Sequence, residues 1–243
     1  MAATDSFARS LMRPLRRTVF HPQWLVLRNE SEERDWIRRM ARGVVLDIGS
    51  ADGHAREWVA NCDYISLDYP ATAVAMYGTR PDVFADGAAL PFGAASIDSV
   101  LLLEVLEHVG DARAVLAEIA RVLKPGGLLL LSVPFLYPLH DAPHDHRRYT
   151  APGLEAAIRR CGLEPSFAQP RNSGFEAVAA LASIACAEAA LVAWRERSWR
   201  VLISPLALAA VPLINVLGWI AARVYGGGRI LASGHSIEAR KPG

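Results

Sequence analysis

The stretch VVLDIGSADGH, residues 44–54, decides the fold class of this chain. Its first residues favour a β-strand, and the strand runs directly into a loop that contains Gly49 and Gly53. A glycine loop after a buried strand commonly brings the backbone close to a nucleotide. The same stretch carries two acids, Asp47 and Asp52, which limit the kind of nucleotide that it can hold.

Strands and helices alternate on the C-terminal side of this stretch. The patterns predict one helix before it, at 29–43, and helices after it at 53–61, 71–78, 111–123 and 152–162. They predict further strands at 64–69, 82–86, 96–103, 128–135, 164–170 and 235–241. Continuously apolar strands that alternate with helices indicate a parallel sheet covered on both faces. We therefore expect an α/β fold with a doubly wound, mostly parallel seven-stranded sheet.

Composition limits the classes of function. The chain has 243 residues, with 26 Lys and Arg against 25 Asp and Glu, so it lacks the basic excess of a nucleic-acid-binding domain. Its cysteines, Cys62, Cys161 and Cys186, form no CxxC pair, which argues against structural zinc and disulfides and favours a reducing compartment. The N-terminal arginines precede no apolar run, so a cleaved signal peptide is not expected.

The sequence predicts four regions. They are a basic amphipathic lead-in and helix at 1–43, a core at 44–172, an apolar helical insertion at 173–230, and a closing edge strand at 231–243. Within the insertion, residues 174–194 carry only Glu176 and Glu188 as charges, and residues 201–222 carry none. The second segment is long enough to span a bilayer, which takes about 20 apolar residues.

The position of the insertion limits how it can meet a membrane. It lies between two strands of one sheet, so it must leave and return on the same side of a bilayer, which excludes a single crossing. The linker between its helices carries Arg195, Arg197 and Arg200, which disfavours a spanning hairpin. We expect monotopic attachment to the cytoplasmic face; the alternative is that the helices pack on a soluble domain or in a dimer interface.

The glycine loop does not fit a dinucleotide. The pattern G-x-G-x-x-G fails at Ala51 and His54, and a pyrophosphate is disfavoured beside the carboxylates of Asp47 and Asp52. Asp68 follows Gly49 by 19 residues, near the spacing expected for an acid that binds ribose hydroxyls. Asp86 ends the next predicted strand and can accept a hydrogen bond from an adenine amino group. The sequence favours a nucleoside ligand without phosphate that is cationic or zwitterionic.

Five segments in order resemble one family. VLDIGSADG, SLD, ADGAALPF, SIDSVLLLEVLEHV and RVLKPGGLLLLSVP, between Val44 and Pro134, are similar to class I S-adenosylmethionine-dependent methyltransferases of the ubiquinone/menaquinone-biosynthesis type. The resemblance implies a Rossmann-like methyltransferase fold and S-adenosylmethionine as cofactor. It departs from the family at Ala51, where glycine is usual, and we expect alanine to be tolerated there if its φ is negative.

The resemblance also implies a cofactor site. Residues around the methionine moiety would be Asp47, Gly49, Ser50, Ala51 and Gly53; those around the ribose, Asp68 and Tyr69; those around the adenine, Asp86 and Gly87; and those closing over the cofactor, Glu104 and Val105. His108, in the segment LEHV, is interpreted as a packing residue rather than an acid or base.

The segment PLHDAPHDHRRYT, residues 138–150, follows the fifth strand and so lies at the ligand edge of the sheet. His140, His144 and Asp145 are candidates for removing a proton from an acceptor hydroxyl, and Arg147, Arg148 and Tyr149 for binding the acceptor. Two alternatives are a hydrogen-bonded structural knot and a metal site; we assign no metal. Thr150 is expected to cap the following helix.

Two functions remain. The first is a methyltransferase that acts on a small or lipid-linked acceptor at a membrane surface, with no nucleic acid as partner and an oligomeric state that the sequence does not define. The second is a membrane-associated scaffold, or pseudoenzyme, that retains the fold. Intact acids at Asp47, Asp68 and Asp86 favour the first, because a scaffold needs none of them. The sequence disfavours a third function, that of a dehydrogenase, because the glycine loop disfavours the pyrophosphate of a dinucleotide.

Overall fold

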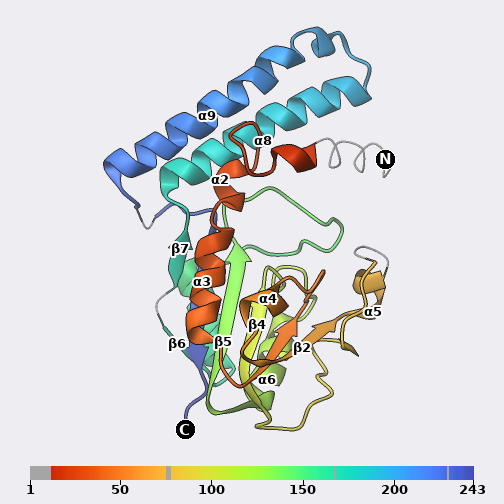
Figure 1. Cartoon of the computed structure of the whole chain (residues 1–243), viewed down its shortest axis with the longest axis vertical. Helices are drawn as coiled ribbons and strands as arrows, with labels where there is room; N and C mark the ends of the chain where they lie inside the picture. The colour runs from red at the N-terminus through yellow and green to blue at the C-terminus, as the bar shows by residue number, and fades with distance from the viewer. Residues whose placement is uncertain (1–11, 75–77, 167, 229) are drawn as a thin grey trace. The chain divides into compact units, whose positions relative to one another are not determined.

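The computed structural model describes residues 12–74, 78–166, 168–228 and 230–243 (Figure 1). Residues 1–11 of the expected lead-in, with Arg9, and residues 75–77 of the expected helix at 71–78 fall outside them. The chain divides into two compact units. The core unit comprises Glu32–Phe135, Leu139–Gln169 and Gly234–Gly243, and the hairpin unit comprises Leu136–Pro138, Pro170–Ser233 and the described residues up to Ser31.

The core unit is built on a mostly parallel sheet. Its strands are β1 (Val44–Ile48), β2 (Asp63–Asp68), β3 (Val83–Phe84), β4 (Ile97–Leu103), β5 (Leu123–Pro134), β6 (Glu164–Pro165) and β8 (Gly234–Arg240). They follow the order β3-β2-β1-β4-β5-β8-β6, and a further short strand, β7 (Gln169–Arg171), lies off this path. Strands β1 to β5 pair in parallel, whereas β8 runs antiparallel to β5 and β6. The strand order reverses between β1 and β4, which is where open α/β sheets bind ligands.

Helices cover both faces of this sheet. On one face, α6 (Ala112–Val122) and α7 (Ala151–Arg160) contribute buried side chains to the larger apolar cluster. On the other, Ile37 of α3 (Glu30–Met40) and Trp58 of α4 (Ala55–Trp58) pack in a second cluster with Val45 and Leu130. The expected doubly wound fold is confirmed. The described residues form eight strands instead of the expected seven, because the expected strand at 164–170 is divided into β6 and β7.

Some boundaries differ from the sequence patterns. Helix α4 has four residues, because buried Val59 leaves helical geometry at φ −119° to pack in the core. Helix α5 covers Pro70–Thr72. The expected break at KPGG lies inside β5, because Leu123 already pairs with Ile97 of β4.

The expectation that the last strand lies at the edge is wrong. Strand β8 lies between β5 and β6, and β6 pairs only with Ala239 and Arg240 at its end. The alternation in HSIEARK therefore arises because one face of β8 is less buried than the other, and not because the strand lies at an edge. Its side chains alternate between buried and partly buried.

The hairpin unit contains two long apolar helices. They are α8 (Gly174–Arg195) and α9 (Ser204–Tyr225), connected by the 3-10 helix η3 (Trp199–Leu202). Each is long and apolar enough to cross a membrane, by length and composition. A Cβ atom on Gly218 of α9 would lie 2.3 Å from that of Ala179 of α8, so the two helices touch closely at this point.

The lead-in packs against the middle of this hairpin. Its described elements are η1 (Arg13–Leu15) and α2 (Trp24–Leu27), and Leu25 of α2 is fully buried against Ala179 and Ala180. The fully buried Asn215 of α9 donates to the backbone oxygens of Val19 at 2.8 Å and His21 at 3.1 Å. It also accepts a hydrogen bond from Ser183 of α8 at 3.0 Å. The side-chain amide of Asn215 thus links α9 by hydrogen bonds to α8 and to the lead-in.

Candidate functional site

The loop after β1 is held in a strained, fixed shape. Gly49 has a φ of 74°, and its N–H donates to the oxygen of Leu67 in β2 at 2.8 Å. A side chain on Gly49 could not fit, because its Cβ would lie 2.4 Å from a methyl carbon of Val105. Ser50 is buried and accepts from Gly53, whose φ is 72°. Val105, which follows β4, therefore packs directly against Gly49.

Ala51 does not meet the condition set for it. Its φ is 45°, in the left-handed region, where an L-residue other than glycine, asparagine or aspartate is strained by about 1–2 kcal/mol. The N–H of Ala51 donates to Asp68 Oδ2 at 3.0 Å. The strain is thus held in place by the acid at the end of the neighbouring strand.

Asp47 and Tyr64 form a buried pair at the start of the loop. Asp47 is 3% exposed, and its Oδ2 accepts a hydrogen bond from the Tyr64 hydroxyl at 2.5 Å. Burial raises the pKa of the Asp47 carboxyl to about 6, against the opposing effect of the Tyr64 hydrogen bond. A cation beside Asp47 would favour its ionised form.

Asp68 organises the end of β2. Its Oδ1 accepts from the Tyr69 N–H at 2.7 Å and the Thr72 hydroxyl at 3.1 Å, in addition to the Ala51 bond on Oδ2. A carboxylate offers about four acceptor positions, so Oδ2 keeps capacity for a ligand hydroxyl. The Tyr69 side chain beside it is 52% exposed.

The remaining cofactor candidates lie at the same edge of the sheet. Asp86 is exposed two residues after β3, and its Oδ1 accepts from the Ala88 N–H at 2.8 Å. A Cβ on the adjacent Gly87 would lie 3.4 Å from an Ile48 methyl carbon. Glu104, directly after β4, has a φ of 54°, and its N–H donates to the oxygen of Ser132 at 2.9 Å. All the candidates thus lie at, or shortly after, the carboxyl ends of β1 to β4.

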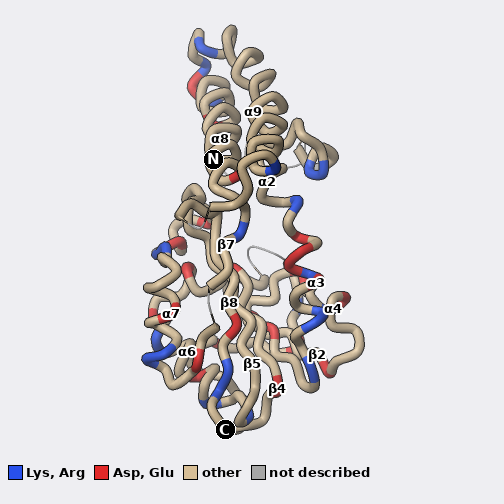
Figure 2. Tube along the Cα trace, turned by 90° about the vertical axis from the view of Figure 1, so that its left-hand side faces the viewer, with Lys and Arg blue, Asp and Glu red and all other residues tan. Residues whose placement is uncertain are grey.

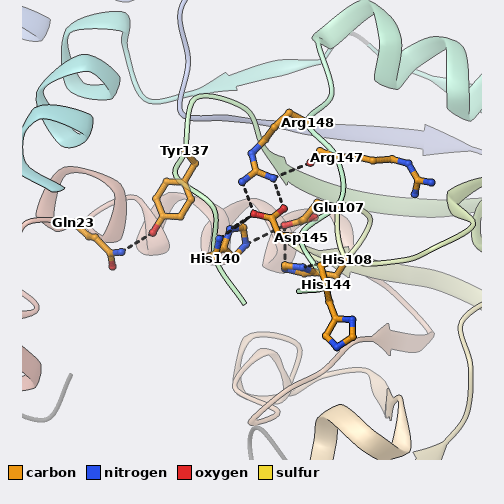
Figure 3. Close-up of polar contacts among 9 residues, drawn as sticks. All are labelled: Gln23, Glu107, His108, Tyr137, His140, His144, Asp145, Arg147 and Arg148. Atoms are coloured by element: carbon orange, nitrogen blue, oxygen red, sulfur yellow. Dashed lines mark hydrogen bonds and ion pairs between the residues drawn. The ribbon is translucent and has the colours of Figure 1, made fainter. Parts of the chain in front are cut away.

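The core-unit part of the segment after β5, residues 139–150, is here called the acceptor loop. Its centre is Asp145, whose side chain is 1% exposed. Both guanidinium NH groups of Arg148 donate to the two Asp145 oxygens, and His140 Nδ1 lies 3.1 Å from Asp145 Oδ2. The hydrogen bonds from Arg148 hold the pKa of Asp145 well below its usual range. Figure 3 shows this group together with Glu107.

Glu107 is a residue that the sequence patterns missed. It is fully buried, and its Oε1 lies 3.7 Å from the Nε2 atoms of both His108 and His140. The available signal was an acid inside the apolar run VLEHV, directly after a buried strand. His108, interpreted from the sequence as a packing residue, has its ring edge-on to that of His140, with centroids 4.8 Å apart.

The other acceptor-loop candidates lie apart from this cluster. The His144 side chain is exposed and its ring faces that of His146, although its backbone oxygen lies 3.2 Å from His108 Nδ1. Arg147 donates to the backbone oxygens of Val109 and Gly110, both at 2.6 Å. Tyr149 packs against the core, and burial raises its pKa. The Thr150 hydroxyl accepts from the Gly153 N–H at 3.2 Å and caps α7, as expected.

Comparison with known proteins shows a similarity between the core unit and methyltransferases. Residues 46–131 match the family model described as "Methyltransferase domain". A probable S-adenosylmethionine-dependent methyltransferase from Mycolicibacterium smegmatis is 34% identical over 157 residues, which cover 55% of this chain and 61% of that protein. Residues 46–131 of the core unit thus form a methyltransferase domain similar to those of class I S-adenosylmethionine-dependent methyltransferases. S-adenosylmethionine is the cofactor of these methyltransferases. This chain spans about three fifths of the length of the Mycolicibacterium smegmatis relative.

Two further similarities support this placement. The ubiquinone biosynthesis O-methyltransferase of Bordetella avium is 27% identical over 164 residues, covering 54% of this chain and 68% of that enzyme. The structure of a putative sarcosine dimethylglycine methyltransferase from Galdieria sulphuraria superposes with a TM-score of 0.54 at 18% identity, covering 89% of this chain and 88% of the other. At that identity the likeness shows a shared fold.

Proposed function

We propose that this protein transfers a methyl group from S-adenosylmethionine to a hydroxyl of a small or lipid-linked acceptor, at the cytoplasmic face of a membrane. The observation that carries the proposal is the negative charge at the carboxyl ends of β1 to β4, here called the cofactor edge. Asp47, Asp68 and Asp86 lie around one glycine loop, and none forms an ion pair with any Lys or Arg in the described part of the chain. Uncompensated negative charge favours a ligand that carries a sulfonium and an ammonium group over a pyrophosphate.

The experiment is calorimetry of the full chain with S-adenosylmethionine, S-adenosylhomocysteine and NAD under one set of conditions. The first two are expected to bind and NAD is not. Tight NAD binding would overturn the proposal. Cofactor binding without release of S-adenosylhomocysteine from any lipid extract would favour the alternative, a membrane-associated scaffold that retains the fold.

The acceptor loop supports chemistry at a hydroxyl. Methyl transfer is an in-line displacement, so the protein mainly orients the acceptor and excludes water, but a hydroxyl must also lose its proton. The His140–Asp145 pair can serve this step, because the carboxylate orients the imidazole and stabilises its protonated form. His140→Ala is expected to keep cofactor affinity and to lower turnover by about 10²-fold. His144→Ala is the matched control, since that ring lies outside the cluster.

The membrane proposal comes from the surface of the hairpin unit. Exposed apolar side chains repeat along one face of α9, at Leu206, Leu213, Leu217, Ile220 and Val224. Figure 2 shows almost no charge along α8 and α9, whereas the connection between them is charged. Trp194 and Trp199 beside that connection are also exposed, as suits residues at the headgroup level.

Contacts within the hairpin unit favour an interfacial arrangement over a spanning one. The lead-in meets Asn215 and Ser183, which lie near the middle of α9 and α8. Its neighbouring residues Arg16 and Arg17 are exposed. If the helices crossed a bilayer, this irregular basic segment would lie in the hydrocarbon layer, where exposed irregular backbone is not tolerated. A hairpin lying in the interface keeps the segment at the level of anionic headgroups.

Sedimentation with phosphatidylglycerol vesicles tests the membrane proposal. The triple variant Leu206→Ser, Leu213→Ser and Leu217→Ser is expected to leave most of the protein unbound to the vesicles. Each exposed leucine contributes apolar area to the contact with the membrane. Val74→Ser, at an exposed apolar residue of the core unit, is the control. A wild-type chain that stays monodisperse without detergent and ignores vesicles would contradict the proposal.

A further inference from the structure

Glu107 is a buried acid whose carboxylate receives no hydrogen bond within the described part of the chain. Its side chain has no exposure, and neither carboxylate oxygen has a hydrogen-bond donor among the described residues. A lone carboxylate out of water is strongly unfavourable unless it is neutralised or paired with a positive charge. The surroundings of Glu107 therefore have to supply a proton or a cation.

The imidazole rings of His108 and His140 both point their Nε2 atoms toward Glu107. His108 Nδ1 lies 3.2 Å from the backbone oxygen of His144, and His140 Nδ1 lies 3.1 Å from Asp145 Oδ2. Both partners only accept hydrogen bonds, so each Nδ1 carries a hydrogen, and each neutral ring presents a lone pair at Nε2. Both Nε2 atoms lie 3.7 Å from Glu107 Oε1 (Figure 3). Three acceptor atoms thus converge on one point, which repels unless a positive charge lies between them.

We propose that Glu107, His108 and His140 bind a divalent transition-metal ion, with zinc the best match. Their ligand atoms lie within 4.8 Å of one another. Two ligands on a tetrahedral zinc ion at about 2.1 Å are separated by about 3.4 Å. The two Glu107–histidine distances of 3.7 Å need only a small contraction, and the two histidine nitrogens, which lie within 4.8 Å of each other, approach by up to about 1.4 Å when the ion binds. Two histidines and one glutamate leave a fourth position open, as in catalytic zinc sites.

The groups behind the ligands fit the same assignment. A metal-bound histidine usually donates its other ring N–H to a carboxylate or a backbone carbonyl, which fixes the tautomer and the ring orientation. Asp145 does this for His140, and the oxygen of His144 does it for His108. Asp145 is itself held by Arg148, so the orientation of the His140 ring is fixed from behind.

This inference rests on the proposed function and specifies how the acceptor is activated. The ligands Glu107 and His108 follow the cofactor-edge residues Glu104 and Val105 in one short segment. An acceptor hydroxyl at the open metal position would release its proton to water more readily, because the ion stabilises the oxyanion. Its oxygen then forms a bond to the methyl carbon as the carbon–sulfur bond breaks, and the sulfonium becomes a neutral thioether. With the ion bound, His140 is a ligand and takes the place of the base described under the proposed function, because its Nε2 lone pair is then used by the metal.

The test uses the full chain, stripped with a chelator, dialysed and titrated with Zn²⁺ by calorimetry and with Co²⁺ by visible absorption. We expect one ion per chain and a Co²⁺ spectrum of a four-coordinate N/O site. Glu107→Gln and His140→Ala are expected to weaken binding by at least about 100-fold, and Asp145→Asn by about 10-fold or more. His144→Ala is the matched control, since it removes an imidazole and keeps the backbone oxygen that contacts His108.

The outcomes separate the possibilities. Metal binding that His144→Ala weakens as much as Glu107→Gln would mark an adventitious surface site and overturn the proposal. Absence of binding by the folded wild-type chain would leave protonated imidazoles as the partners of Glu107. If Glu107→Gln fails to fold, His140→Ala and the absorption spectrum still decide. Calorimetry with S-adenosylhomocysteine on the stripped chain tests the cofactor assignment separately, because none of the three ligands belongs to the cofactor edge.

Discussion

Asp68 at the cofactor edge and Asp145 in the acceptor loop are held in different ways. Asp68 accepts hydrogen bonds from the main-chain N–H groups of Ala51 and Tyr69. Asp145 is bound mainly by the side chains of Arg148 and His140. The first acid therefore fixes the shape of a loop, and the second balances buried charge. Substitutions at the two places should fail in different assays.

The largest effect on stability is expected from Asp145→Ala. Removing the carboxylate leaves Arg148 and His140 without their counter-charge in a nearly buried site, at a cost of about 4 kcal/mol. Because the pKa of Asp145 is lowered in the folded state, its contribution is complete above about pH 4 and is lost on acidification below that. Urea unfolding at several pH values measures it. An equal loss in Asp68→Ala would break the comparison.

Asp47 is expected to behave in the opposite way. Its pKa is raised to about 6, so ionisation opposes folding and stability falls as the pH rises from about 4 to 6. Asp47→Asn keeps an oxygen that can accept from Tyr64 and removes this penalty. A difference of about two pKa units corresponds to about 3 kcal/mol, which the variant should gain above pH 6. A variant less stable than wild type at pH 8 would contradict the assignment.

Asp68→Ala should affect binding more than stability. Loss of charge-assisted hydrogen bonds to the ribose, with release of the Ala51 N–H, is expected to weaken S-adenosylmethionine binding by about 2 kcal/mol, or about 30-fold. Calorimetry measures the change, and Asp145→Asn is the control from the acceptor loop. Unchanged affinity in Asp68→Ala would remove the ribose assignment.

The smallest effect is expected from Ala51→Gly. Glycine relieves the positive φ but makes the unfolded chain more flexible, so the net gain in stability should stay below about 1 kcal/mol. Thermal unfolding with and without S-adenosylhomocysteine measures it. A gain that appears only with ligand would show that the alanine methyl group hinders the cofactor and not the fold.

Local patterns predicted the features that depend on neighbours in sequence. Strand β1, the glycine loop after it and the acids at strand ends follow from period and spacing, because parallel strands place their carboxyl ends at one edge. The cap at Thr150 follows from one side chain and the helix beside it. These features need no knowledge of distant contacts.

Features that depend on distant contacts could not be predicted in this way. The φ of Ala51 is set by its bond to Asp68, 17 residues away. The partners of Glu107 are brought together only when the acceptor loop returns to the end of β4. The place of β8 inside the sheet depends on β6, which is two residues long and carries little pattern of its own.

The amide of Asn215 also has a consequence for the order of synthesis. Its acceptors, Val19 and His21, leave the ribosome 196 and 194 residues before it. Contacts so distant in sequence form late, after the entropy of closing the chain between them has been lost. The lead-in therefore has to wait for these two hydrogen bonds until α9 is made, while the intervening core sequence emerges and can fold. A ribosome stalled before residue 215 would hold a chain in which Leu25 can already pack on Ala179 and Ala180, while the backbone oxygens of Val19 and His21 still lack their donor.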